Sequence, residues 1–152
     1  MIGLPAQNTP IFIGDHTFKG GTLAALHFLK CKLRPTAIVC SNDMMAIGVL
    51  RVMTERGIRV SREVSVVGFD DIHLAEFTNP PLTTVYVAAG TGHAAFRGLE
   101  QLWAGRSSDA NNSIRVRTGL VIRQSTDSPL DVADAVQIRS RSRKVKMRPA
   151  AI

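Results

Sequence analysis

The stretch AIVCSNDMMAIGVLRVMTERGIRVSREVSVVGFDD, residues 37–71, decides the fold class. It begins with a short apolar run at 37–40, continues with a helical pattern at 43–56 that stops at Gly57, and ends with a second apolar run at 64–69. A strand, a helix and a further strand in this order form the repeating unit of a parallel sheet, because the helix returns the chain to the same edge. The stretch therefore predicts an α/β fold with an open parallel sheet flanked by helices.

The sequence on either side continues this alternation. We expect further strands at 11–14 and 82–87, and an edge or surface strand at 113–123 that is interrupted at Gly119. Amphipathic patterns predict two more helices, at 18–29 and 92–104, each with one apolar face that should lie on other apolar surface.

The helix expected at 43–56 is apolar on almost all sides. Ser41, Asn42 and Asp43 are candidates for its N-terminal cap. A helix apolar on several sides needs a second covering surface besides its own sheet. The pattern indicates either a subunit interface or a helix deeply covered within its own domain, and it does not decide between them.

Composition limits the size and the location of the protein. The chain has 152 residues, of which 45% are hydrophobic and 20% charged, which is enough for one domain with its own core. It holds neither an apolar run of roughly 18–20 residues nor a signal sequence, so we expect no membrane contact and a cytoplasmic location. Cys31 and Cys40 are too few for a disulfide framework and are expected to stay reduced.

The net charge of +7 is concentrated in one part of the chain. Residues 1–138 hold 13 Lys and Arg and all 12 Asp and Glu, while residues 139–148 supply the other six positive charges. The basic segment has no apolar periodicity, so we expect residues 129–152 to form a disordered tail. It predicts at most nonspecific contact with phosphates.

Motifs for enzymatic chemistry are scarce. The sequence has no G-x-S-x-G, no H-E-x-x-H and no P-loop, and its four histidines are scattered singly. Gly90, Gly92 and Ala95 match a dinucleotide-binding pattern, but the acidic residue required after the next strand is missing. We therefore expect no enzyme, no cofactor and no metal site.

Polar side chains follow three of the expected strands. Asp15 and His16 follow the first, Ser41 and Asn42 the second, and the pair 70–71 (Asp-Asp) the third. In open α/β sheets ligands bind beyond the carboxyl ends of the strands. Carboxylate, amide and imidazole groups suit a small polyhydroxylated molecule, and capping of the helices that follow is the alternative for each residue.

These motifs carry a resemblance to a known family. The order SNDMMAIG, SVVGFDD and PPLTTV, with GDHTFKGG upstream and LVIRQST downstream, resembles the C-terminal subdomain of the lactose-repressor/galactose-repressor (LacI/GalR) transcription regulators over roughly residues 11–128. The resemblance implies a fold like that of periplasmic binding proteins. It also implies an effector-sensing and dimer-forming part of a repressor that responds to a sugar or a similar small polar ligand.

The resemblance further implies roles for individual residues. Asn42 and Asp70 match effector-contacting positions, and His16 stands where the family usually has an aromatic ring stacked on the ligand. The dimer interface is expected to include Ile47, Gly48, Arg51, Leu74, Phe77 and Thr78.

The chain lacks parts that the family has. Nothing in it resembles the helix-turn-helix module, so we expect contact with DNA only through a module missing here. Residues 1–128 are then a partial effector-binding domain, in which 88–112 resemble the crossover into an N-terminal subdomain that is absent. The apolar face of the helix at 92–104 would then lack the sheet that usually covers it. A fragment of a periplasmic sugar-binding protein of an ABC transporter is the alternative. The sequence does not indicate which effector, which operator or which sign of regulation applies.

Overall fold

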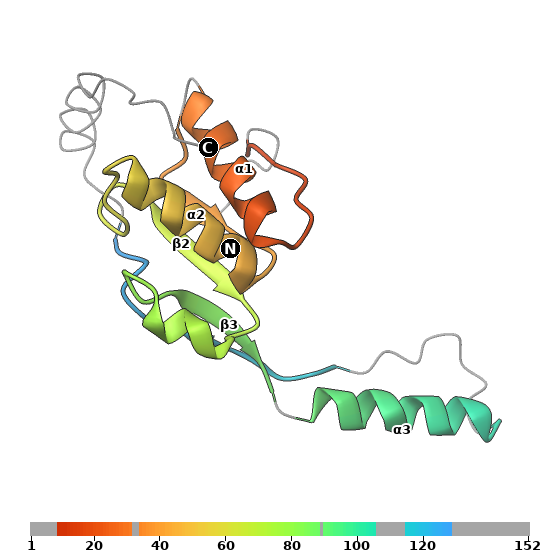
Figure 1. Cartoon of the computed structure of the whole chain (residues 1–152). Coiled ribbons are helices and arrows are strands. Elements are labelled where there is room, and N and C mark those ends of the chain that lie inside the picture. The colour runs from red at the N-terminus through yellow and green to blue at the C-terminus, as the bar shows by residue number, and fades with distance from the viewer. Residues whose placement is uncertain (1–8, 32–33, 89, 106–114, 129–152) are drawn as a thin grey trace.

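The computed structural model describes residues 9–31, 34–88, 90–105 and 115–128. Helices and strands alternate along the chain, and one helix packs against the sheet while a second helix packs on the first (Figure 1). The elements in chain order are α1 (Phe18–Lys30), β1 (Ala37–Val39), α2 (Asp43–Glu55), β2 (Ser65–Phe69), the short 3-10 helix η2 (His73–Phe77), β3 (Thr83–Val87), α3 (Thr91–Trp103) and β4 (Thr118–Val121).

The sheet has the order β1-β2-β3-β4. The first three strands run parallel, with Val39 opposite Val67 and Phe69 opposite Val85, and β4 pairs antiparallel with β3. The expected α/β fold is therefore confirmed, with a mixed rather than a fully parallel sheet. Because the parallel strands share one direction, the turns after β1 and β2 lie at one edge.

Helix α2 lies between the sheet and α1 (Figure 1). Val66 of β2 and Leu82 before β3 are completely buried, and so are Ala46 and Val49 of α2. Burying one such valine or leucine stabilises the fold by about 1.5–3 kcal/mol. The second covering surface that the apolar pattern of α2 requires is therefore supplied by α1 of the same chain.

Two glycines allow α1 and α2 to approach each other closely. A Cβ on Gly21 would meet the backbone of Met45, and a Cβ on Gly48 would meet the carbonyl oxygen of Phe18. Gly48, which was expected at a dimer interface, is thus buried at a helix contact within the chain.

The expectation of a strand at 11–14 is wrong for the part of the chain that the structure describes. The segment is assigned to no strand, and the side chains of Ile11 and Ile13 are exposed, while Phe12 packs against the core. A run of β-branched residues favours extended backbone, but a strand also requires a hydrogen-bonded partner.

The expected interruption at Gly119 is also wrong, because this residue lies inside β4 opposite Tyr86. A Cβ on Gly119 would collide with the Tyr86 ring. The glycine therefore makes room for a cross-strand aromatic side chain rather than breaking the strand. Residues 113–114 of the expected strand lie outside the described residues.

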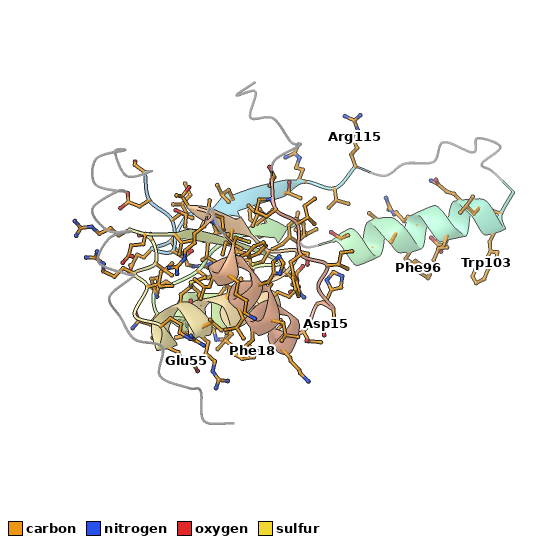
Figure 2. All side chains as sticks on the ribbon, turned by 90° about the horizontal axis from the view of Figure 1, so that it is seen from above. Asp15, Phe18, Glu55, Phe96, Trp103 and Arg115 are labelled. Atoms are coloured by element: carbon orange, nitrogen blue, oxygen red, sulfur yellow. The ribbon has the colours of Figure 1, made fainter. Side chains whose placement is uncertain are left out.

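Helix α3 extends away from the body of the protein (Figures 1 and 2). None of its residues is buried against the part of the chain that the structure describes, and Trp103 is 90% exposed. Phe96 and Trp103 project from the same side of the helix (Figure 2). The helix expected at 92–104 is confirmed, and its apolar face lies on no apolar surface of the described residues, as the family resemblance implied. The proposed basic tail at 129–152 and residues 106–112 of the proposed crossover lie outside the described residues.

The described helices include none that is long and apolar enough to cross a membrane.

The close contact between α1 and α2 gives a stability prediction. Gly48→Ala places a methyl group against backbone atoms of α1 and should lower the free energy of unfolding by about 1–3 kcal/mol. Chemical denaturation followed by circular dichroism measures this. Gly92→Ala is the matched control, because a Cβ there meets nothing within 4 Å, and it should change the stability by less than about 1 kcal/mol. Equal stability of the two variants would contradict the contact.

Candidate functional site

The turn before α1 carries the first two candidate residues, Asp15 and His16. The Asp15 carboxylate accepts hydrogen bonds from the Thr17 hydroxyl at 2.7 Å and from the Thr17 amide at 3.0 Å. The hydroxyl bond is the main reason why the pKa of Asp15 lies below its usual value. Thr17 in turn caps α1 by accepting a bond from the Gly20 amide. The turn is thus fixed by its own hydrogen bonds, although no strand precedes it.

Asn42 joins this turn to the beginning of α2. Its side-chain oxygen accepts a hydrogen bond from the Met45 amide at 2.9 Å, which caps the helix. Its side-chain nitrogen donates to the carbonyl oxygen of His16 at 2.9 Å, and the Ser41 hydroxyl lies 3.4 Å from His16 Nδ1. The capping alternative is therefore confirmed for Asn42. The same side chain also brings His16 to the end of β1.

Backbone strain is concentrated at these turns. His16, Asp70 and Asp71 have φ values of 60°, 112° and 51°, in the left-handed region that glycine favours. Such conformations cost about 1–3 kcal/mol each and gather at ligand sites and switch regions. All three residues were singled out from the sequence because they follow expected strands. Asp70 is exposed, and its amide donates to the Val85 carbonyl at 2.8 Å.

Asp43 lies beneath this edge and is completely buried. Its carboxylate accepts hydrogen bonds from the Thr84 hydroxyl at 2.6 Å and from the Ile72 amide at 2.9 Å. Desolvation raises the pKa of Asp43 above its usual value even though both hydrogen bonds favour the charged form. The sequence indicated Asp43 only as a possible cap. The glycine at position 68 is the feature of the sequence that could have indicated the buried carboxylate, because a Cβ there would collide with it.

Asp71 is held by a residue that the sequence analysis did not single out. Arg123 Nη2 lies 2.8 Å from Asp71 Oδ1, and Arg123 Nη1 donates to the Leu82 carbonyl at 2.9 Å. This ion pair is largely shielded from solvent, so it ties the turn after β2 to the segment after β4. The charge of Asp71 is thereby offset, whereas Asp15 and Asp70 present exposed carboxylates at this edge.

The turn that carries Asp15 lies at one end of the body (Figure 2). Figure 2 shows Asp15 on the side from which α3 extends, with Glu55, the last residue of α2, at the opposite end. The structure brings His16 and Asn42 into contact, and it ties the turn that begins at Asp70 to the buried Asp43 through the Ile72 amide. These residues form the candidate site.

The residues expected at a dimer interface lie on α2 (Ile47, Gly48 and Arg51) and on or directly after η2 (Leu74, Phe77 and Thr78). Arg51, on the outside of α2, pairs with Glu55 at 2.8 Å and lies 5.9 Å from the centre of the Phe18 ring. On η2, Leu74 and Phe77 are 52% and 67% exposed. Ile47 and Thr78 are half-buried, and Gly48 is covered by α1.

Two other features of the sequence were considered as possible binding sites. Gly90 caps α3 with a φ of 105°, and the start of this helix lines a shallow hollow of about 220 Å³ together with Arg115 and Arg117. Over residues 9–31, 34–88, 90–105 and 115–128, no group of three His, Cys, Asp or Glu residues is arranged to hold a metal ion. Cys40 is buried, and desolvation raises the pKa of its thiol to about 12.

Comparisons with known proteins agree on one family. A family model described as a periplasmic binding protein-like domain matches residues 3–126. The transcriptional repressor PurR of Photobacterium profundum is 36% identical over 127 residues, and the repressor CytR of Escherichia coli is 42% identical over 72 residues. The matches cover 81% and 47% of this chain. The chain spans only 37% and 21% of the length of these two relatives.

Solved structures give the same result. A lac repressor dimer bound to operator and the anti-inducer ONPF matches with a TM-score of 0.66 and 34% identity, over 76% of this chain and 40% of that one. A putative LacI regulator from Bacillus cereus subsp. cytotoxis matches with a TM-score of 0.68 and 30% identity, over 74% and 40%. These relatives are regulators rather than enzymes, and they do not favour the alternative of a transport protein.

The double role of Asn42 gives a prediction. Asn42→Ala removes the helix cap and the bond to His16, and should lower the free energy of unfolding by about 0.5–2 kcal/mol. Asn42→Ser is the control, because serine keeps a capping oxygen but is too short to hold the His16 carbonyl. It should recover most of the loss in thermal denaturation. An alanine variant as stable as the unchanged chain would contradict the assignment of Asn42 as the cap.

Proposed function

This chain belongs to the periplasmic binding protein-like domain family, in the group of LacI-type transcriptional repressors, and on that premise we propose that it senses a sugar or a similar small polar effector and forms a dimer. The observation that carries the proposal is the meeting of His16 with Asn42 beside the strained turn at Asp70. In support of it, Asn42 and Asp70 follow β1 and β2, whose carboxyl ends lie at the edge where α/β sheets bind ligands, and Asn42 holds the His16 carbonyl there.

The chemistry of the candidate site suits hydroxyl groups. The exposed Asp70 carboxylate accepts hydrogen bonds from hydroxyl donors, and the Asn42 amide both donates and accepts. The carboxylates of Asp15 and Asp70 disfavour an anionic ligand at this edge. The imidazole of His16 offers a flat surface for a ring, in place of the larger aromatic residue that the family usually has.

Solved relatives support a sugar-like effector. A LacI family regulator from Lactobacillus casei was solved with bound sucrose and with bound glucose, with TM-scores of 0.58 and 0.57 to this chain. A polyhydroxylated ligand of this kind is the effector class that we assign to the chain.

A dimer is supported by the exposed apolar residues of η2. Leu74 and Phe77 of this helix are exposed, and so is Met44 in the first turn of α2. Covering these side chains in a two-fold contact removes apolar surface from water, which favours association. In the full-length regulator, effector binding would shift the equilibrium between two arrangements of this dimer and so alter contact with DNA through a helix-turn-helix module. Such a regulator acts in the cytoplasm, where the DNA is.

Asp70→Asn tests the effector site. The substitution keeps the size of the side chain but removes the charge, and should weaken effector binding by about 1.5–3 kcal/mol. Titration of the ¹⁵N-labelled chain with glucose, sucrose and ONPF, followed through the amide resonances of Asn42 and Asp70, measures the affinity. We expect at least one ligand to shift both resonances.

The control for this titration is Glu100→Gln on the exposed helix α3, which removes the same charge away from the candidate site. It should leave the affinity unchanged. Failure of all three ligands to shift the two resonances, or equal affinities for Asp70→Asn and the unchanged chain, would contradict the proposal.

Phe77→Glu tests the dimer surface. A charge at this position cannot be buried without a partner, so the substitution should weaken the dimer at least about tenfold in sedimentation experiments. Leu99→Glu on α3 is the matched control for nonspecific adhesion and should leave the specific dimer intact. An unchanged chain that is monomeric at tens of micromolar, or equal effects of the two substitutions, would exclude the η2 surface as the interface.

A further inference from the structure

A single buried carboxylate connects the candidate effector site with the candidate dimer surface. Asp43 is the first residue of α2, and it accepts hydrogen bonds from Ile72, which precedes η2, and from Thr84 of β3. Asp43 is completely buried. It can therefore affect binding of a ligand or of a partner subunit only through the residues that it holds in place.

The two segments that Asp43 joins carry different parts of the proposed function. The turn from Asp70 to Ile72 carries the effector carboxylate at its beginning and leads directly into η2, which carries Leu74 and Phe77. Helix α2 follows the other effector residue, Asn42, and carries Arg51 on its outer side. A movement of the turn relative to α2 would thus displace both the candidate effector residues and η2.

We propose that Asp43 is a positioning residue that holds the 70–72 turn and η2 against α2, so that the effector site and the dimer surface keep one relative arrangement. The proposal rests on the proposed function for the roles of Asp70 and of η2. Its structural part, the hold of Asp43 on Ile72, stands by itself.

The arrangement around Asp43 supports this role. The strained backbone at Asp70 and Asp71 does not persist without external restraint. Asp43 supplies one restraint at Ile72, and Arg123 supplies another at Asp71. Gly68 leaves the space that the carboxylate occupies, because a Cβ at position 68 would strike it. A buried hydrogen bond to a carboxylate is worth more than one between neutral groups.

Amide hydrogen exchange in the ligand-free chain tests the hold on Ile72. In Asp43→Ala the Ile72 amide loses its acceptor, and its exchange should accelerate by about 10- to 150-fold. The Val66 amide of β2, which donates to the Ser125 carbonyl at 2.8 Å, should keep its protection. Unchanged exchange at Ile72, or an equal acceleration at Val66, would overturn the proposal.

Asp43→Asn provides the conservative variant and a test that does not depend on the folding of the alanine variant. The asparagine oxygen accepts from Ile72 and its nitrogen donates to Thr84, so protection of Ile72 should stay within about threefold. Asp70, Asp71 and Cys40 are the other ionisable groups around this carboxylate, and Arg123 pairs with Asp71. In the unchanged chain the Ile72 amide resonance should titrate with a midpoint above the usual aspartate value of 3.8, and in Asp43→Asn this titration should disappear. Its persistence in Asp43→Asn would show that it does not come from Asp43 and would overturn the proposal.

Self-association gives the readout at the other end of the connection. Asp43→Ala should weaken dimerisation at least about tenfold, although Asp43 is buried and does not touch the partner. Asp43→Asn, which keeps both hydrogen bonds, should dimerise like the unchanged chain. A dimer unaffected by Asp43→Ala would overturn the coupling to η2. The exchange and titration experiments use no ligand, so their results do not depend on whether Asp70 binds an effector. A failure of the effector assignment is therefore distinguished from a failure of the role proposed for Asp43.

Discussion

The burial of α2 between α1 and the sheet is the constraint on which the rest of the structure depends. Its apolar side chains, with Val49 and Ala46 at the centre, face both layers at once, and the glycines at positions 21 and 48 let the two helices approach closely. The beginning of α2 is thereby fixed at the edge of the sheet where β1 and β2 end. Asn42 and Asp43 are placed by this burial, and they in turn hold His16 and Ile72.

Hydrogen bonds and one ion pair link the polar residues at this edge from one turn to the next. The Asn42 amide serves α2 through Met45 and the turn before α1 through the His16 carbonyl. The carboxylate of Asp43 serves the turn after β2, and the Asp71–Arg123 ion pair extends that link to the segment after β4. Strained conformations at His16 and Asp70 are tolerated because these contacts restrain their neighbours. The turns at this edge thus keep their conformations only because the apolar core holds the segments that carry them in place.

Periodicity in the sequence was enough to predict α1, α2 and α3, and the short apolar runs between helical patterns predicted the three parallel strands, because both signals depend on the local sequence. Relations between distant segments could not be read in this way. The segment at 11–14 has the composition of a strand, but whether it finds a pairing partner depends on the rest of the fold. The apolar character of α2 fitted an interface and a covered core equally well, and only the position of α1 decided in favour of the core. Arg123 lies far from Asp71 in the sequence, so no spacing indicated their ion pair.

The candidate site was predictable in part for the same reason. His16, Asn42 and Asp70 follow apolar runs, and the resemblance to the LacI/GalR family pointed to the same residues. The role of Asp43 beneath them depends on Thr84 and Ile72, which reach it only in the folded chain.

The most direct test of the account is a crystal structure of the chain with a bound sugar, chosen from a panel by its measured affinity. The account predicts electron density within hydrogen-bonding distance of the Asp70 carboxylate and the Asn42 amide. Ligand density confined to the hollow beside Arg115 and Arg117 at the start of α3 would contradict it.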